Sequence, residues 1–139
     1  MPRVLISDKL SEEAVNIFEA AGVEVDFKPG LPADELKEII HNYDGLAVRS
    51  ATKVTSEIIA LAANLQVVGR AGIGVDNVDI PAATAAGILV MNTPFGNAIT
   101  TAEHAIAMML SLTRQIPQAH MSTIASKWEK SKFMGTEIT

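Results

Sequence analysis

Two arginines are the residues of this sequence best suited to chemistry, because each directly follows a short apolar run. Arg49 comes after the run 46–48 and Arg70 comes after the run 66–69, and the whole chain has only four arginines. An arginine guanidinium presents a planar set of donors that matches a carboxylate or a phosphate. The two residues therefore indicate a small-anion site, and ion pairs that only stabilise the fold are the alternative.

Two glycines follow the second of these arginines, in the segment Arg70-Ala71-Gly72-Ile73-Gly74. Because glycine has no Cβ, backbone N–H groups beside it can approach an anion closely. We expect a ligand carboxylate at this glycine loop and a phosphate nearer the arginines, while glycines that merely permit tight turns are the alternative. The segment is not a dinucleotide fingerprint, since G-x-G-x-x-G would need a glycine where Asn77 stands.

Composition excludes several other chemistries. The chain has no cysteine, which excludes disulfides, thiolate metal sites and cysteine nucleophiles. The three histidines, His41, His104 and His120, are too far apart in sequence to share the usual spacing of metal ligands. Glu103 and His104 are adjacent on a predicted helix and point in different directions, so we expect a buried, satisfied polar pair rather than an acid–base pair.

The charge balance bears on the kind of partner. The 139 residues carry a formal net charge of −5, and 48% of them are hydrophobic, which excludes a disordered chain. An acidic surface does not favour nucleic acid or anionic membranes. The longest uninterrupted apolar run, 105–110, is far shorter than the roughly 18 residues of a membrane span. We expect a soluble, cytoplasmic protein that binds neither nucleic acid nor membrane.

Short apolar runs alternate with helical patterns along the first two-thirds of the chain, which is typical of an α/β protein with a parallel sheet. The fold class predicted is a flavodoxin-like, five-stranded parallel sheet of order 2-1-3-4-5 flanked by helices. Ser11 and Thr55 are the predicted N-caps of two of these helices. The strands are expected at 3–7, 23–27, 46–48, 66–69 and 88–91, with helices at 12–20, 32–40, 56–62 and 80–85.

This topology places the ends of the strands together at one edge, where ligands of open α/β sheets bind. Arg49 and Arg70 then follow adjacent strands at that edge. A phosphorelay receiver would need an aspartate where Arg49 stands, and a flavodoxin would need a hydroxyl-rich or glycine-rich phosphate loop in place of 7–10. Both of these functions of the same fold are excluded on those residues.

The last forty residues do not belong to the sheet. The stretch 99–115 predicts one long helix that is apolar on most sides, and a second helical stretch follows Pro117. Helices that are apolar all round are buried in proteins. We therefore expect a domain over residues 1–97, then a protruding helical segment over 98–139 that associates with a second copy of the chain.

Four blocks of sequence resemble the D-isomer-specific 2-hydroxyacid dehydrogenase family, and within it the branch that oxidises 3-phosphoglycerate. These blocks are 48–54, 67–79, 87–94 and 127–135, and the resemblance extends over essentially the whole chain as the N-terminal portion of such an enzyme. It implies an NAD-dependent conversion of 3-phosphoglycerate to 3-phosphohydroxypyruvate in serine biosynthesis by a cytoplasmic homo-oligomer. Residues 1–97 would bind substrate, and residues 98–139 would be interdomain and dimerisation helices that open an NAD-binding domain.

The resemblance also implies roles for individual residues. Ile73 and Thr101 correspond to contacts of NAD, and Lys130 stands where some relatives have an arginine that reaches the neighbouring subunit's site. The implied substrate-binding residues are Arg49, Ser50, Arg70, Gly72, Ile73, Gly74, Asn97 and Lys130. No residue of this chain matches the family's catalytic residues and none is assigned to a metal, so these 139 residues alone are expected to be inactive. The alternatives are a non-enzymatic module that binds a small anion or a partner, and a relative that acts on another 2-hydroxy acid.

Overall fold

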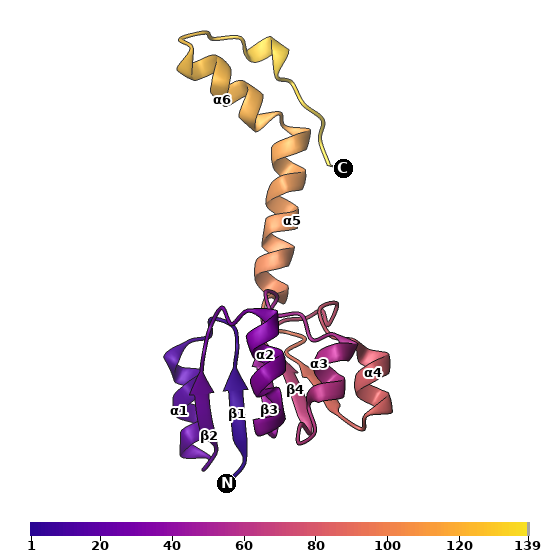
Figure 1. Ribbon diagram of the computed structural model, residues 1–139. Helices are drawn as coiled ribbons and strands as arrows, with labels where there is room; N and C mark the ends of the chain where they lie inside the picture. Colours follow the sequence, from indigo (N-terminus) through magenta and orange to yellow (C-terminus); the bar gives the residue numbers. More distant parts are fainter. Residues whose placement is uncertain (139) are drawn as a thin grey trace. The chain divides into compact units, whose positions relative to one another are not determined.

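A computed structural model describes residues 1–138. The chain divides into two compact units, Met1–Gly96 and Asn97–Thr139. The first unit is a five-stranded sheet with helices on both of its faces (Figure 1). The second unit consists of helices.

The strands of the first unit are all parallel and lie in the order β2-β1-β3-β4-β5, which confirms the predicted topology. The register pairs Val48 with Arg70 and Arg70 with Asn92, so β3, β4 and β5 end level with one another. The strands are β1 (Arg3–Ile6), β2 (Glu24–Phe27), β3 (Gly45–Val48), β4 (Val67–Arg70) and β5 (Leu89–Asn92).

One face of the sheet is covered by α2 (Ala33–Ile39), α3 (Ser56–Leu61) and α4 (Ile80–Ala85), and the short helix η1 (Ile40–Asn42) continues α2. The main core lies beneath them. It joins side chains of four strands to those of the three helices, with Leu5, Leu46, Val48, Val68, Leu36, Ile40, Ile58, Ile59 and Ala83 among its members. This burial of alternate strand residues fixes which side chains face the helices.

The opposite face is covered in part by α1 (Glu12–Ala20), whose Val15 and Phe18 pack on Val4, Ile6 and Ala47. Over β5 the same face remains open, and Leu89 and Met91 are 59% and 54% exposed. Gly69 and Met91 are among the residues that line an apolar cleft of about 450 Å³ beside α1. Parallel sheets are normally covered on both faces, so this half is unusually accessible in the described chain.

Two helices lack the side-chain hydrogen bond that the predicted N-caps would make. Ser11 and Thr55 do stand at the N-cap positions of α1 and α3, but neither side chain accepts a hydrogen bond there. Their main-chain carbonyls accept from the first turn instead, at 3.0 Å from the nitrogens of Ala14 and Ile59 respectively. The side chain that caps a helix is Asp79, which accepts from Ala82 N at 3.0 Å at the start of α4.

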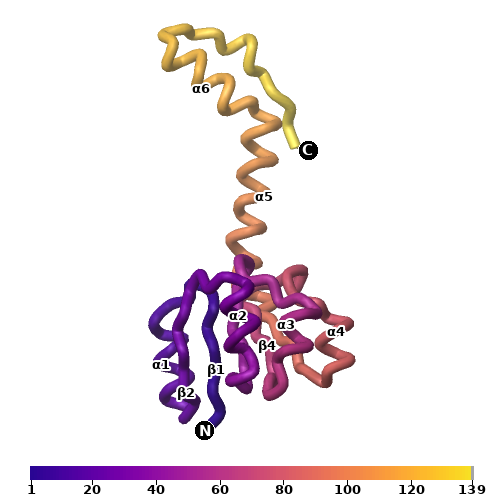
Figure 2. The backbone as a smooth tube through the Cα atoms, in the orientation of Figure 1, coloured from indigo at the N-terminus to yellow at the C-terminus, as the bar shows by residue number. Residues whose placement is uncertain are grey.

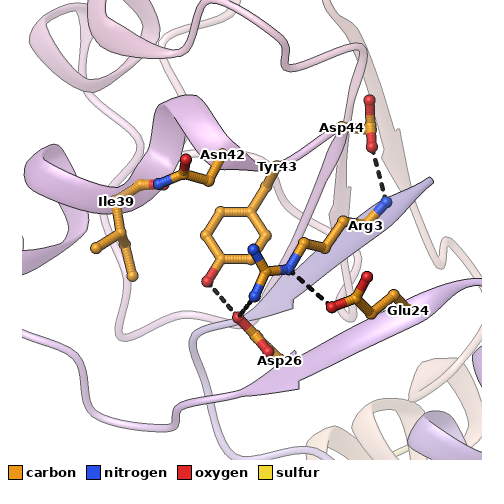
Figure 3. Close-up of polar contacts among 7 residues, drawn as sticks. All are labelled: Arg3, Glu24, Asp26, Ile39, Asn42, Tyr43 and Asp44. Atoms are coloured by element: carbon orange, nitrogen blue, oxygen red, sulfur yellow. Dashed lines mark hydrogen bonds and ion pairs between the residues drawn. The ribbon is translucent and has the colours of Figure 1, made fainter. Parts of the chain in front are cut away.

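A polar cluster joins the first residue of β1 to β2 and to the turn before β3 (Figure 3). Arg3 pairs with Asp26 at 2.9 Å and with Glu24 at 3.3 Å, and its backbone nitrogen donates to Asp44 at 2.7 Å. The buried Tyr43 donates its hydroxyl to Asp26 at 2.5 Å, and its ring lies 5.1 Å from the Arg3 guanidinium carbon. The cluster ties the β2 edge to the centre of the sheet.

The second unit contains α5 (Ala98–Thr113), α6 (Ile116–Ile124) and the short helix η2 (Lys130–Lys132). The predicted long helix stops two residues early because Gln115 adopts a left-handed conformation, with φ of 52°. Helix α5 buries none of its residues, so the prediction of a buried pair at Glu103 and His104 is wrong: both side chains are exposed. Within residues 1–138, no helix combines the length and the apolar character that crossing a membrane would require.

Candidate functional site

The carboxyl ends of β3, β4 and β5 lead into three loops at one edge of the first unit (Figure 2). A tight turn over 49–52 follows β3, a longer loop over 71–77 follows β4, and β5 leads into 93–96. The register pairs Val48 with Arg70, so Arg70 is the last residue of β4, one residue earlier than expected, and Arg49 directly follows the neighbouring strand β3. The structure thus brings the two segments together as the sequence predicts.

Arg49 is exposed and has no ion pair within residues 1–138. The guanidinium makes one long hydrogen bond, from Nη1 to the carbonyl of Lys9 at 3.5 Å. Most of its donor capacity faces solvent. A guanidinium in this condition can bind a carboxylate or a phosphate without first breaking an ion pair.

Arg70 differs from Arg49 in its surroundings. Its side chain is only 11% exposed, and Nη1 donates to Asp76 Oδ1 at 2.5 Å. This hydrogen bond is the main reason that the pKa of Asp76 lies below its usual value. The Nε of Arg70 is buried with no partner in the described chain. Arg70 therefore forms an ion pair within the protein, as the alternative interpretation of the sequence expects. This ion pair does not prevent an anionic ligand from competing with Asp76 for the guanidinium.

The two glycines of this loop make room for the guanidinium of Arg70. A Cβ added to Gly74 would lie 2.8 Å from Asp76 Oδ1 and 3.3 Å from Arg70 Nη1. A Cβ on Gly72 would lie 3.4 Å from Arg70 Nε. Neither glycine has a positive φ. The two glycines therefore allow the Arg70 and Asp76 side chains to lie close to the loop backbone, and they are not required for a left-handed turn. The anionic group beside Gly74 is the carboxylate of Asp76.

Sequence reasoning missed the residues that hold the turn after β3. The carboxylate of Asp8, which follows β1 and is 4% exposed, accepts from the backbone nitrogens of Arg49 at 2.6 Å and Thr52 at 3.1 Å. It also accepts from the Thr52 hydroxyl at 2.8 Å, and that hydroxyl lies 2.9 Å from Ser7 Oγ. In the sequence, the position of Asp8 directly after a predicted strand indicates that it lies at the ligand-binding edge of the sheet.

Two asparagines hold the loops, and they were likewise not identified as site residues. Asn77 Nδ2 donates to the carbonyls of Arg49 at 2.7 Å and Thr52 at 2.6 Å. Asn92, the last residue of β5, donates to the carbonyl of Ile73 at 2.6 Å. The loop that carries Arg70 is thus bonded to the strand on one side and to the turn on the other.

The remaining predicted site residues lie in both units. Ser50 is exposed within the turn, and Ile73 is 44% exposed in the loop after β4. Asn97, Thr101 and Lys130 belong to the second unit and are exposed there. Their contribution to a common site remains a prediction.

The comparison with known protein families assigns the chain to a class of enzymes. A family model of the D-isomer specific 2-hydroxyacid dehydrogenase catalytic domain matches residues 4–136. The chain belongs to this family. The match includes both the sheet and the helices of the second unit.

The relatives give a narrower similarity. D-3-phosphoglycerate dehydrogenase of Archaeoglobus fulgidus is 51% identical over 136 residues, which are 98% of this chain and 26% of that protein. The enzyme of that name from Homo sapiens is 53% identical over 136 residues, with the same coverage. The solved structure of NAD+-bound 3-phosphoglycerate dehydrogenase of Entamoeba histolytica is 34% identical with a TM-score of 0.71, covering 81% of this chain and 39% of that one. The chain spans about a quarter of the length of the archaeal and human relatives.

Proposed function

We propose that this chain is the substrate-binding part of an NAD-dependent oxidoreductase that converts 3-phosphoglycerate to 3-phosphohydroxypyruvate in L-serine biosynthesis. The observation that carries the proposal is about 50% identity, over 98% of the chain, to proteins named D-3-phosphoglycerate dehydrogenase from an archaeon and a mammal. Arg49 supports it, because it is exposed, has no ion pair among the described residues 1–138, and the substrate carries two anionic groups.

The two anionic groups have different partners in this proposal. Arg49 binds the phosphate, since its guanidinium has nearly all its donors free and can form charge-assisted, bidentate hydrogen bonds. The substrate carboxylate meets Arg70 and the backbone of the loop from Gly72 through Ile73 to Gly74. Ser50, Asn97 and Lys130 complete the set as further polar contacts.

The cofactor proposed is NAD, with its main binding site outside these residues. Ile73 and Thr101 would contact its nicotinamide end. Ile73 suits a flat ring because its side chain is 44% exposed while Asn92 holds its carbonyl in place. NAD would supply the hydride acceptor for oxidation of the substrate's hydroxyl-bearing carbon. We assign no catalytic residue within this chain, and these 139 residues alone are not expected to turn over substrate.

The assembly and location proposed are a cytoplasmic homodimer or larger homo-oligomer formed through the long helix, without nucleic-acid or membrane partners. The support for association is the set of apolar side chains that α5 exposes, among them Ile99 and Leu112 at 76% each. The net charge of −5 supports the absence of polyanionic partners. The same proposal assigns substrate binding to residues 1–97, and the interdomain and dimerisation contacts to residues 98–139.

Binding of 3-phosphoglycerate and of glycerate to the 139-residue chain tests the substrate. Arg49→Ala is expected to weaken 3-phosphoglycerate about 10- to 100-fold, the equivalent of a charge-assisted hydrogen bond or two, and to change glycerate little. NMR titration measures both affinities, and Arg114→Ala, which removes an exposed arginine of the second unit, is the matched control. Equal weakening of both ligands would indicate a different 2-hydroxy acid, and no binding by the unmodified chain would contradict the proposal.

A further inference from the structure

The turn over 49–52 is held by side chains on two sides. Asp8 accepts from the backbone N–H groups of Arg49 and Thr52, at 2.6 and 3.1 Å. Asn77 donates to the backbone carbonyls of the same two residues, at 2.7 and 2.6 Å. Both polar groups of each residue at the ends of the turn are therefore bonded to one of these two side chains.

The two holding residues come from different parts of the chain. Asp8 follows β1, is nearly completely buried and accepts a third donor, the Thr52 hydroxyl. Asn77 lies seven residues after Arg70, near the end of the loop that follows β4. Since a backbone with both its N–H and its C=O bonded cannot rotate without breaking one of them, the Cα of Arg49 is fixed while its guanidinium extends into solvent.

The same contacts join the turn to the loop that follows Arg70. Next to the Asn77 side chain, Val54 N donates to the Asn77 carbonyl at 2.8 Å, and Asp79 N donates to the Val54 carbonyl at 2.9 Å. These bonds form a short parallel bridge between Val54 and Val78. The two arginine-bearing segments are thereby kept in one relative position.

We propose that Asp8 and Asn77 are positioning residues that hold Arg49 in place for an anionic ligand, although neither touches that ligand. An arginine on a mobile turn loses conformational freedom when it binds, and a turn that is already held avoids most of that cost. The inference rests on the proposed function for the identity of the ligand, 3-phosphoglycerate. The holding of the turn itself can be measured without a ligand.

The first measurement is amide hydrogen exchange at Arg49 and Thr52 in the 139-residue chain. Asp8→Asn and Asn77→Ala are expected to accelerate exchange at these two amides at least tenfold. The matched controls lie at the opposite end of the sheet: Asp44→Asn weakens the charge-assisted bond from Arg3 N, and Asn64→Ala removes the bond to the His41 carbonyl. Exchange that is no faster than in these controls would overturn the inference.

The second measurement is a double-mutant cycle with Arg49→Ala, read as affinity for 3-phosphoglycerate. Asn77→Ala is expected to weaken binding at least fivefold when Arg49 is present and less than twofold when it is absent. A merely structural role would weaken binding equally in both backgrounds, and that result would overturn the inference. If the Asp8→Asn variant does not fold because residue 8 is buried, both measurements are made on the Asn77→Ala variant. Accelerated exchange in a chain that binds no 3-phosphoglycerate would uphold the held turn and contradict the proposed function instead.

Discussion

Arg49 directly follows β3 and Arg70 ends the neighbouring strand β4, yet the two guanidinium groups differ in what they offer a ligand. Arg49 keeps its charge in water, so it loses hydration when it binds but breaks no ion pair. Arg70 is mostly buried and already bonded to Asp76, an exposed acid that a ligand carboxylate could replace. We infer that Arg49 contributes mainly affinity, whereas Arg70 selects ligands that can compete with Asp76 in the narrow space left by Gly74.

A pH-dependent stability is expected from Tyr43. Burial first, and then its hydrogen bond to Asp26, raise the pKa of Tyr43 to about 12, against an ordinary value near 10. Between these values the unfolded chain ionises this hydroxyl and the folded chain does not, so unfolding becomes easier as pH rises. The free energy of unfolding should fall by about 1–2 kcal/mol from pH 10 to 12, and this contribution is fully present below pH 10.

Tyr43 is the only tyrosine of the chain, so tyrosinate absorbance reports this group alone. Its titration midpoint should lie near 12 in the native protein and near 10 in concentrated urea. Tyr43→Phe, which keeps the ring over Arg3, should remove this part of the alkaline loss of stability. A native midpoint near 10 would contradict the expectation.

At the scale of elements, the sheet face that carries α1 depends on small residues in its central strands. A Cβ added to Gly45 in β3 would lie 2.9 Å from Val4 Cγ2 and 3.4 Å from Val67 Cγ1, between two packed neighbours. Gly45→Ala is therefore expected to lower the free energy of unfolding by about 1–3 kcal/mol through overpacking. Urea unfolding followed by circular dichroism measures the change.

Gly69 is the matched control, because it lies in the adjacent strand and a Cβ there would meet nothing within 4 Å. Gly69→Ala should leave stability unchanged or raise it by up to about 1 kcal/mol, since alanine restricts the unfolded chain more than glycine does. If both variants lost the same stability, close packing between β1, β3 and β4 would not be the reason for glycine at position 45.

The elements were predictable from sequence because their signals are local. The runs at 46–48 and 66–69 are rich in apolar residues, as strands of a parallel sheet usually are, and the observed strands differ from them by one residue at each affected end. The loop contacts were not predictable in the same way. Asp8 and Thr52 are 44 positions apart, and the carboxylate that accepts three donors from the turn looks in the sequence like an ordinary surface acid.

The helix caps and the long helix α5 show a second reason why some features could not be predicted from the sequence. Ser11 and Thr55 have the residue types of N-caps, but a side chain competes with water for the first-turn amides, and the sequence does not tell which wins. The apolar pattern of 99–115 correctly predicted a helix, yet apolarity does not say what covers it. That depends on contacts outside the helix, which is a property of the whole molecule.

Both units of the chain expose large apolar side chains. Helix α5 exposes Ile106 at 52%, Met108 at 59% and Leu112 at 76%, and β5 exposes Leu89 and Met91. Large apolar side chains that are exposed together on one helix, as on α5, typically mark an interface. The 139-residue chain is therefore expected to associate, with a mass by light scattering of at least twice the 14.8 kDa of one copy.

Met108 and Leu112 lie four residues apart and hence on the same side of α5. Replacing both with glutamate places two more negative charges on that side, so the variant should shift toward the mass of a single copy as concentration falls. Ile17→Glu is the control, because Ile17 is an equally exposed side chain, at 63%, on helix α1 of the other unit. A monodisperse monomer from the unmodified chain would contradict association altogether. Only a substitution at the contacting surface should weaken the association. A shift toward the single-copy mass caused by Ile17→Glu, and not by the α5 variant, would therefore indicate that the sheet unit forms the interface.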